Sequence, residues 1–222
     1  MAIDEFLLTR QLDYPVLRTY GWSNPCVSIG YFQSIQDVNH ERCQQEGVDV
    51  LRRITGGGAV FHDKEFTYSF VTGEFPQKIL DSYKEICEII ISSLKYCGFD
   101  AEFSPLNDVT VKGKKVCGNA QTRKNNKLLQ HGTILLEVDK KRMFSLLNVP
   151  TEKISDKNIS DVGDRVMGIS KNFDEIAEIM KKSAKEIFQC ELVPFSLDED
   201  ELATCKEIIK EKYSNKKWNF RR

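Results

Sequence analysis

The sequence lacks the features that would place a protein in a membrane or outside the cell. It has no run of about 18 apolar residues, the length that a transmembrane helix needs. Its first ten residues, MAIDEFLLTR, carry acidic groups early and contain no apolar core of signal-peptide length. The net charge is only −1, so the bulk charge indicates neither nucleic acid nor anionic lipid as a partner. We therefore expect a cytoplasmic protein that binds no nucleic acid and no membrane.

Metal-ligand and disulfide patterns are also scarce. The three histidines, His40, His62 and His131, do not stand at metal-ligand spacing. The seven cysteines are odd in number and form no CxxC pair, which argues against a zinc site and a disulfide framework. The simplest interpretation is that they are free thiols in a reducing compartment.

The hydrophobic pattern changes along the chain. The centre contains β-type runs, including VDVLRRI and VFHDKEFTYSFV, with tight turns near Lys112-Gly113 and Asn125-Asn126. We predict an α+β fold, a central mainly antiparallel or mixed sheet with flanking helices, and a single domain over 1–222 without a separate C-terminal accessory domain. The predicted helices cover 2–12, 38–46, 77–97, 140–147, 172–188 and 198–213, and the polar stretch 150–171 is expected to be a functional or mobile loop.

The most unusual segment is RRITGGGAVFHD, residues 52–63. Its glycines, Gly56, Gly57 and Gly58, let the backbone approach a ligand closely, and the N–H groups of such a loop bind anions. Arg52 and Arg53 precede it, and guanidinium groups pair with carboxylate or phosphate oxygens. The spacing is not that of a P-loop. The segment predicts a site for a small anionic molecule, and the plainer alternative is a flexible turn with solvated arginines.

A second segment, NDVTVKGKKVCGNAQTR, covers residues 107–123. It places Lys115 on a strand, and strand alternation predicts that Lys115 and Cys117 share a face. The small residues Gly118 and Ala120 leave room for a ligand beside the lysine, whose charge could stabilise a developing oxyanion and a phosphate leaving group. The alternative is a solvated lysine on a hairpin.

In the third segment, LLQHGTILL, the polar residues His131 and Thr133 interrupt an apolar strand. Such an interruption costs stability unless the polar groups are hydrogen-bonded or functional. A hydrogen-bonded core histidine is the commoner explanation for a lone residue of this kind.

In this order, the three segments resemble the lipoate–protein ligase and octanoyltransferase family of the biotin/lipoate ligase superfamily. RRITGGGAVFHD resembles the family's arginine–triple-glycine signature, NDVTVKGKKVCGNAQ its Asn-Asp … Lys … Gly-Asn/Ser-Ala segment, and QHGTILL its His-Gly-Thr segment. MAIDEFLL and YGWSNPCVSIGYFQ are similar to the N-terminal part of such proteins. The resemblance covers roughly residues 1–140 strongly and 140–222 loosely, and it implies the catalytic-domain fold of that superfamily.

The resemblance implies a lipoate–protein ligase that activates lipoate or octanoate with ATP and Mg²⁺ and then transfers the acyl group to a carrier lysine. The implied carriers are lipoyl domains of 2-oxoacid dehydrogenase acyltransferase subunits or the glycine cleavage H protein, and a separate accessory subunit could be needed. Lys115 is the implied catalytic residue, and Asp108 would face the magnesium ion. The implied substrate- and nucleotide-binding residues are Arg52, Arg53, Gly56, Gly57, Gly58, His62, Asn107, Asp108, Gly118, Ala120, His131 and Thr133.

Two other activities fit the same segments. The first is an ATP-independent octanoyl or lipoyl transferase that forms a cysteine thioester. Residues 100–107 contain no cysteine where such a nucleophile is expected, which favours the ligase and leaves Cys117 as the only serious candidate. The second is a non-catalytic protein that binds lipoate or a carrier. The joint presence of Arg53, Gly56–Gly58 and Lys115 argues against it.

Overall fold

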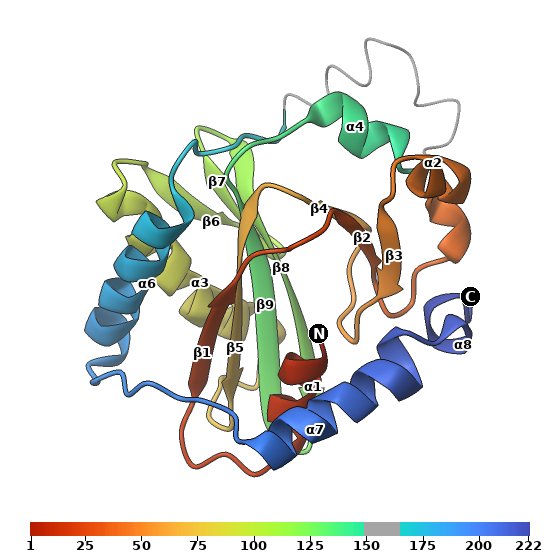
Figure 1. Ribbon diagram of the computed structural model, residues 1–222. Helices are drawn as coiled ribbons and strands as arrows, with labels where there is room; N and C mark the ends of the chain where they lie inside the picture. Colours follow the sequence, from red (N-terminus) through yellow and green to blue (C-terminus); the bar gives the residue numbers. More distant parts are fainter. Residues whose placement is uncertain (149–164) are drawn as a thin grey trace.

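One six-stranded sheet and one three-stranded sheet, with helices around them, make up the computed structural model, which describes residues 1–148 and 165–222 (Figure 1). The larger sheet has the strand order β1-β5-β9-β8-β7-β6, and every neighbouring pair is antiparallel. The smaller sheet has the order β3-β2-β4, with β2 parallel to β3 and antiparallel to β4. The strands are β1 Val16–Tyr20, β2 Cys26–Ile29, β3 Asp49–Arg52, β4 Val60–His62, β5 Glu65–Thr72, β6 Ala101–Ser104, β7 Asp108–Val111, β8 Lys114–Lys124 and β9 Lys127–Leu135.

Two tight turns organise the larger sheet, as the sequence predicts. Lys112 and Gly113 both have positive φ between β7 and β8, and Asn125 and Asn126 both have positive φ between β8 and β9. Two-residue hairpin turns that match the twist of the strands need this left-handed backbone, which glycine and asparagine tolerate best. The turns therefore bring β7, β8 and β9 together as consecutive antiparallel neighbours.

Helices α3 and α6 cover one face of the larger sheet and pack against each other (Figure 1). Ile86, Ile90 and Leu94 recur at helical spacing along α3 and are buried in the main core beneath it. A smaller cluster, which includes Leu7 and Leu129, joins α1 to the sheet. The helices are α1 Ala2–Thr9, α2 His40–Gln45, α3 Ile79–Tyr96, α4 Lys140–Ser145, α6 Phe173–Phe188, α7 Glu199–Ile208 and α8 Lys216–Asn219, with a 3-10 turn at Ile35–Asp37 and a π-turn at Ile209–Tyr213.

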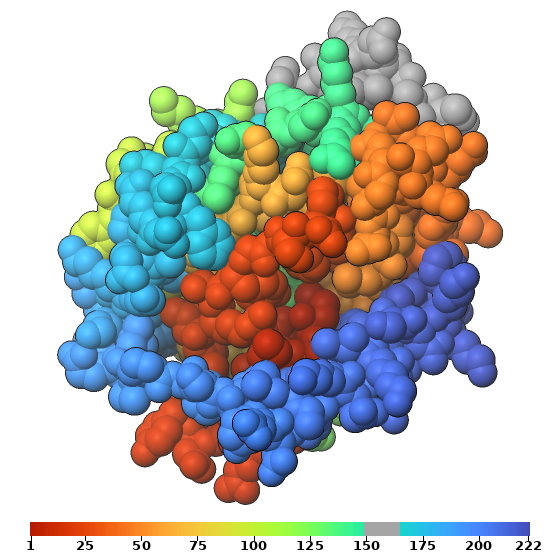
Figure 2. Space-filling model, in the orientation of Figure 1, coloured from red at the N-terminus to blue at the C-terminus, as the bar shows by residue number. Residues whose placement is uncertain are grey.

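The C-terminal segment connects the two sheets from outside. In Figure 2 it forms the blue band along the lower edge of the visible face, beneath the red N-terminal residues. Helix α7 packs on α1, and α8 packs on β3. The indole Nε1 of Trp218 donates to the carbonyl of Arg52 at 2.8 Å, and the amide N–H of Arg52 donates to Asn219 Oδ1 at 2.9 Å. Residues distant in sequence thus fix the edge of the smaller sheet.

The predicted α+β class and the predicted helices are confirmed, but VFHDKEFTYSFV is not one strand. It divides into β4 and β5, which belong to different sheets. Residues 149–164, and with them most of the expected 150–171 loop, lie outside the described residues. The described part of that stretch pairs with the larger sheet, where the N–H of Met167 donates to the carbonyl of Lys115 at 2.9 Å. Within the described residues, no helix is long and apolar enough to cross a membrane.

Candidate active site

A cleft lined by residues of both sheets brings the three predicted segments together. It encloses a cavity of about 160 Å³. Arg52, Gly56 and Asp108 do not line the cleft. The predicted site residues that do line it are Arg53, Gly57, Gly58, His62, Asn107, Lys115, Gly118, Ala120, His131 and Thr133.

Arg53 shapes the glycine loop from beneath. Its Nη2 donates to the carbonyls of Gly56 and Gly58 at 2.8 and 2.6 Å, and its Nη1 donates to the carbonyl of Ser28 at 2.8 Å. Burial lowers the pKa of Arg53 to about 10, so the guanidinium still carries its charge at neutral pH. Gly57 has φ +90°, a backbone conformation that side chains rarely adopt. The arginine therefore holds the loop against the cleft, and its positive charge lies immediately behind the loop.

Arg52 is separated from Arg53 by the alternation of an extended chain, which sends successive side chains to opposite sides. Arg52 is fully buried, and its Nη1 donates to the carbonyls of Gly30 and Gln33 at 2.9 and 2.7 Å. Its Nη2 donates to the carbonyl of Asn219 at 3.1 Å. The expected pair of anion-binding arginines is therefore not assembled, because Arg52 joins the smaller sheet to the C-terminal segment.

A β-bulge determines the direction of the Lys115 side chain. Thr110 pairs with Lys115 while the next residue pair is Val109 with Cys117, so Val116 is an extra residue in β8. The bulge breaks the alternation, and Lys115 lines the cleft whereas Cys117 is buried in the main core. The prediction that Lys115 and Cys117 share a face is wrong for this reason.

The Lys115 amine lies across the backbone of Gly118. A Cβ atom at position 118 would stand 2.7 Å from Lys115 Cε and 2.8 Å from its Nζ. The Nζ forms an ion pair with Asp108 Oδ1 at 2.7 Å, and the lysine side chain remains 39% exposed. Asp108 therefore orients the lysine. Among the described residues, no group of three or more His, Cys, Asp or Glu side chains is arranged to hold a metal ion.

Asn119 forms the floor of the cleft between Lys115 and β9. Its Oδ1 accepts a hydrogen bond from the Tyr68 hydroxyl at 2.6 Å, and its Nδ2 donates to the carbonyl of Asn107 at 2.8 Å. The Asn107 side chain in turn donates to the carbonyl of Asn119. Gly132 lies opposite Asn119, and a Cβ atom there would overlap Asn119 Oδ1. Glycine is thus required at position 132 by close packing across β8 and β9.

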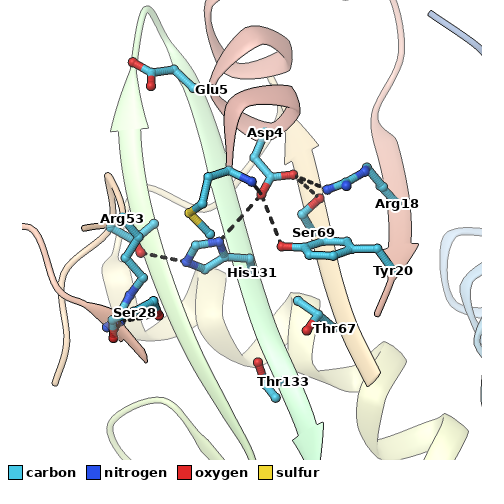
Figure 3. Close-up of polar contacts among 12 residues, drawn as sticks. Asp4, Glu5, Arg18, Tyr20, Ser28, Arg53, Thr67, Ser69, His131 and Thr133 are labelled. Atoms are coloured by element: carbon cyan, nitrogen blue, oxygen red, sulfur yellow. Dashed lines mark hydrogen bonds and ion pairs between the residues drawn. The ribbon is translucent and has the colours of Figure 1, made fainter. Parts of the chain in front are cut away.

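His131 connects the larger sheet to the loop that carries the glycines. Its Nε2 is 2.6 Å from Thr55 Oγ1, and its Nδ1 faces the buried carboxylate of Asp4 at 3.9 Å (Figure 3). Burial lowers the pKa of His131, although Asp4 acts in the opposite direction. The Asp4 carboxylate also accepts hydrogen bonds from Arg18 at 2.9 Å and Ser69 at 2.8 Å. His131 is therefore neutral at neutral pH and serves as a fixed hydrogen-bonding partner of the loop.

A second histidine, His62, is held between two partners at the other side of the cleft. Its Nδ1 contacts Glu65 Oε1, and its Nε2 is 2.6 Å from Ser28 Oγ. Trp22 stacks on the imidazole ring with a centroid separation of 4.1 Å. Thr133 Oγ1 donates to the same Glu65 oxygen at 3.4 Å. The serine, histidine and glutamate thus stand in a continuous hydrogen-bonded row.

The cysteines stand apart from this cleft. All seven fall within the described residues, and none lines the cleft. The Cys117 side chain is fully buried, and burial raises the pKa of its thiol well above the usual value. Burial likewise raises the pKa of Cys87 to about 12. A reactive thiolate needs a depressed pKa and access to substrate. Cys117 and Cys87 lack both properties, because burial raises their pKa values and neither residue lines the cleft.

Sequence reasoning missed several residues of the cleft wall. Trp22 and Ser28 line the cleft from β2 and the segment before it, Thr67 lines it from β5, and Asn119 and Gly132 line it from the central hairpin. Four of them lie inside quoted motifs: YGWSNPCVSIGYFQ contains Trp22 and Ser28, and the second and third motifs contain Asn119 and Gly132. The motifs contain these residues, but the motifs do not show which of the residues lie together in the cleft. That depends on how the two sheets are placed against each other.

Comparison with known proteins gives consistent family matches. A family model described as the lipoyl protein ligase A/B catalytic domain matches residues 1–191. Octanoyltransferase LipM of Halalkalibacterium halodurans is 32% identical over 259 aligned residues, covering 100% of this chain and 94% of that protein. A bi-partite lipoate protein ligase from Thermoplasma acidophilum, solved in a study that includes its E2 lipoyl domain, superposes with a TM-score of 0.91 at 30% identity, covering 99% and 89% of the two chains. A lipoate-protein ligase A bound with ATP has a TM-score of 0.85 at 26% identity, covering 99% and 92%.

These matches confirm the resemblance and the fold but correct the expected activity. The ATP-dependent ligase was the main expectation, whereas relatives that match the whole chain are named octanoyltransferases, the activity of the alternative. The physical reason is that both reactions act on the same kind of acyl carbonyl, so the three motifs suit either one. The two reactions differ in the group that leaves the carbonyl, and the motifs do not identify that group. What the matches establish is that the chain belongs to the lipoyl protein ligase A/B catalytic-domain family.

Proposed function

We propose that this chain transfers an octanoyl or lipoyl group from an activated donor to a lysine of a lipoyl carrier domain, without ATP. The carriers would be lipoyl domains of 2-oxoacid dehydrogenase acyltransferase subunits or the glycine cleavage H protein, and the location the reducing cytoplasm, which seven unpaired cysteines suit. Residues 1–222 would act as a single catalytic domain. The full-length relatives named octanoyltransferase support the reaction class.

The observation that carries the proposal is the position of the Lys115 amine. It lies over Gly118 at the wall of the cleft, oriented by Asp108 and more than one-third exposed. Acyl transfer builds negative charge on the carbonyl oxygen, and a fixed cation at that point lowers the barrier. A side chain at position 118 would occupy the space of the amine. The glycine and the lysine together thus suit an acyl carbonyl that enters from the cleft.

The opposite wall is suited to hold the acyl donor in place. Gly57 and Gly58 bring bare backbone to the cleft, and the buried Arg53 adds positive charge behind them. Ala59 and Val60 add apolar surface to the same wall. A carbonyl held between Lys115 and this loop would have its hydrocarbon chain beside apolar side chains. We infer that the loop positions the acyl group and that the lysine stabilises the charge.

ATP, Mg²⁺ and an accessory subunit belong to the ligase expectation and form no part of this proposal. The case for ATP rests on a structural relative that is described as bound with ATP. The case for a second subunit rests on a relative that is described as a bi-partite ligase. The described residues of this chain contribute a single carboxylate, Asp108, next to the lysine, and it is already paired. A nucleotide arm in the transfer assay measures this difference.

The test is an intact-mass assay with an octanoylated acyl carrier protein as donor and an apo-lipoyl domain as acceptor. We expect the acceptor to gain one octanoyl group without ATP, and an acceptor with its modified lysine changed to arginine to gain none. A second arm offers free octanoate with ATP and Mg²⁺. Modification in the second arm only would overturn the proposal, and no modification in either arm would favour a non-catalytic binding protein.

A further inference from the structure

The row formed by Ser28, His62 and Glu65 has the geometry of a nucleophile, a base and an orienting acid. These residues come from β2, β4 and the first position of β5. The hydroxyl of Ser28 is 2.6 Å from His62 Nε2, and the other ring nitrogen, Nδ1, contacts Glu65 Oε1. In hydrolases and acyltransferases of unrelated folds, a base within hydrogen-bond reach of a hydroxyl and oriented by a carboxylate activates that hydroxyl.

Several contacts around His62 and Glu65 fix the orientation of the base. Glu65 Oε1 accepts hydrogen bonds from Thr67 at 3.1 Å and Thr133 at 3.4 Å in addition to its contact with His62. Trp22 stacks on the imidazole at 4.1 Å, and its Nε1 donates to Thr67 Oγ1 at 3.0 Å. The ring can therefore neither rotate nor exchange its nitrogens without breaking several contacts. Sites that act on a reacting atom show this kind of second layer of support.

The charge around Ser28 also suits a nucleophile. Arg53 Nη1 donates to Ser28 Oγ at 3.0 Å, and the two side chains lie together in Figure 3. A neighbouring guanidinium favours the negatively charged form of an oxygen that is losing its proton. Ser28 is buried at the floor of the cleft, which would shield an ester formed there from water. The same cleft contains the Lys115 amine, and none of the chain's cysteines lines it.

We propose that Ser28 is an acyl-accepting nucleophile, so that the acyl group passes through an oxyester on this residue between donor and carrier lysine. The inference rests on the proposed transferase function and deepens it. It replaces the cysteine thioester of the transferase alternative, for which Cys117 is poorly placed because, unlike Ser28, it does not line the cleft.

The reaction balances in two steps. In the first, Ser28 Oγ bonds to the carbonyl carbon of an acyl thioester, its proton passes to His62 Nε2, and the carbon–sulfur bond breaks. The thiolate leaves with that proton as a thiol. In the second, the neutral amine of the carrier lysine attacks the ester carbonyl and His62 takes its proton. The bond to Ser28 Oγ breaks, the proton returns to this oxygen, and the products are an amide and free serine. No oxidant, metal or nucleotide enters either step.

The decisive experiment traps the ester. The whole chain is mixed with octanoylated acyl carrier protein in the absence of an acceptor, then examined by intact mass and peptide mapping. We expect one octanoyl group on Ser28 that survives neutral hydroxylamine and is removed by alkaline hydroxylamine, as an oxyester is. Ser28→Cys should shift the adduct to one that neutral hydroxylamine removes. Ser93→Ala is the matched control, because Ser93 is a buried serine in α3 whose hydroxyl donates to the carbonyl of Ile89.

Activity measurements separate this inference from the function on which it rests. We expect Ser28→Ala to melt within a few degrees of the parent protein, because Arg53 keeps its bond to the Ser28 carbonyl, and to lose at least about 100-fold in transfer rate. Glu65→Gln should still form the ester but more slowly, with a changed pH profile. Transfer by the parent protein without any Ser28 adduct, and at near-parent rate in Ser28→Ala, would overturn the inference and leave the transferase function intact. Absence of transfer under every condition would instead refute the proposed function.

Discussion

Replacing Lys115 by alanine should separate activity from stability. The lysine pairs with Asp108 at 2.7 Å, but the two side chains are 39% and 30% exposed. Ion pairs of this exposure contribute about 0–1 kcal/mol to stability, because water already solvates both charges. The main-chain hydrogen bonds of Lys115 to residues 165 and 167 do not depend on its side chain. We therefore expect Lys115→Ala to remain folded, with a free energy of unfolding within about 1 kcal/mol of the parent protein.

The effect on catalysis should be much larger. Removal of one donor to a developing oxyanion typically costs about 100- to 1000-fold in rate, because the donor acts only in the transition state. Lys115 is the one lysine that lines the cleft among the described residues. We expect the octanoyl-transfer rate of Lys115→Ala to fall by this factor while the apparent affinity for the carrier changes little.

Gly118→Ala provides an independent test of the same geometry. The three atoms nearest to its new methyl group would be Cε and Nζ at the flexible end of Lys115 and, at 3.7 Å, Oδ1 of Asp108. The fold can accommodate this methyl because the lysine moves aside, but the amine then leaves its position. A misplacement of about 1 Å in a reacting site costs on the order of 100-fold in rate. Lys115→Ala and Gly118→Ala should therefore each fold stably and lose most of the transfer activity. The activity losses of the two changes should not add up in the double variant, because both remove the same amine from its position.

The assay measures initial rates of octanoyl transfer to an apo-lipoyl domain beside thermal unfolding of each variant. Lys114→Ala is the matched control, because Lys114 is the exposed neighbour on the same strand and does not line the cleft. Transfer by Lys115→Ala at the parent rate would refute the role of the amine. Loss of activity that followed a loss of folded protein would show that the lysine is needed for stability instead.

Three further outcomes follow from the contacts described above. Cys117→Ala should keep a substantial part of the transfer activity, and the parent protein should carry no thioester at Cys117, which mass spectrometry with neutral hydroxylamine checks. Gly132→Ala should destabilise the fold by about 1–3 kcal/mol in denaturant titrations, since its methyl group would overlap Asn119, whereas Gly73→Ala, with nothing within 4 Å, should not. Stability should fall as pH drops. Burial lowers the pKa of His131, and although burial alone would raise the pKa of Asp4, the N-terminal amine, His131 and Arg18 lower it. As the pH falls, the unfolded chain therefore takes up these protons before the folded chain does, at His131 below about pH 6.5 and at Asp4 below about pH 4. Each of these protonations favours unfolding. Urea titrations should show a smaller loss between pH 5 and pH 3 in Asp4→Asn.

The local fold was accessible from sequence because its signals are local. Helical spacing of apolar residues located α3, and the positive-φ turns at Lys112-Gly113 and Asn125-Asn126 gave the hairpins. The separation of β4 from β5 was not accessible. His62 ends one strand and Glu65 begins the other, and the β-type run continues across the break. Only the pairing partners reveal that the two strands belong to different sheets.

The candidate site was predictable in its composition and not in its connections. The motifs named ten residues that line the cleft, because close backbone approach and fixed charge require particular residue types. They could not show that Arg52 faces away from the cleft, since both arginines look equivalent until the sheet is known. The bulge at Val116 separated Lys115 from Cys117 in the same way. In both cases one residue of register decides which side chain reaches the ligand, and register is a property of the partner strand.

The cleft depends on how the two sheets are held together, which gives Arg52 a role without contact to substrate. Ser28 and His62 lie on the smaller sheet, whereas Lys115 and His131 lie on the larger one. Arg52 ties the edge of the smaller sheet to α8, and α7 in the same C-terminal segment packs on α1, which rests against the larger sheet. The spacing between Lys115 and Ser28 therefore depends in part on a buried arginine whose Nη1 and Nη2 donate to backbone carbonyls outside the cleft. In this chain the two adjacent arginines thus have different surroundings: Arg53 lines the cleft, and Arg52 joins the smaller sheet to the C-terminal segment.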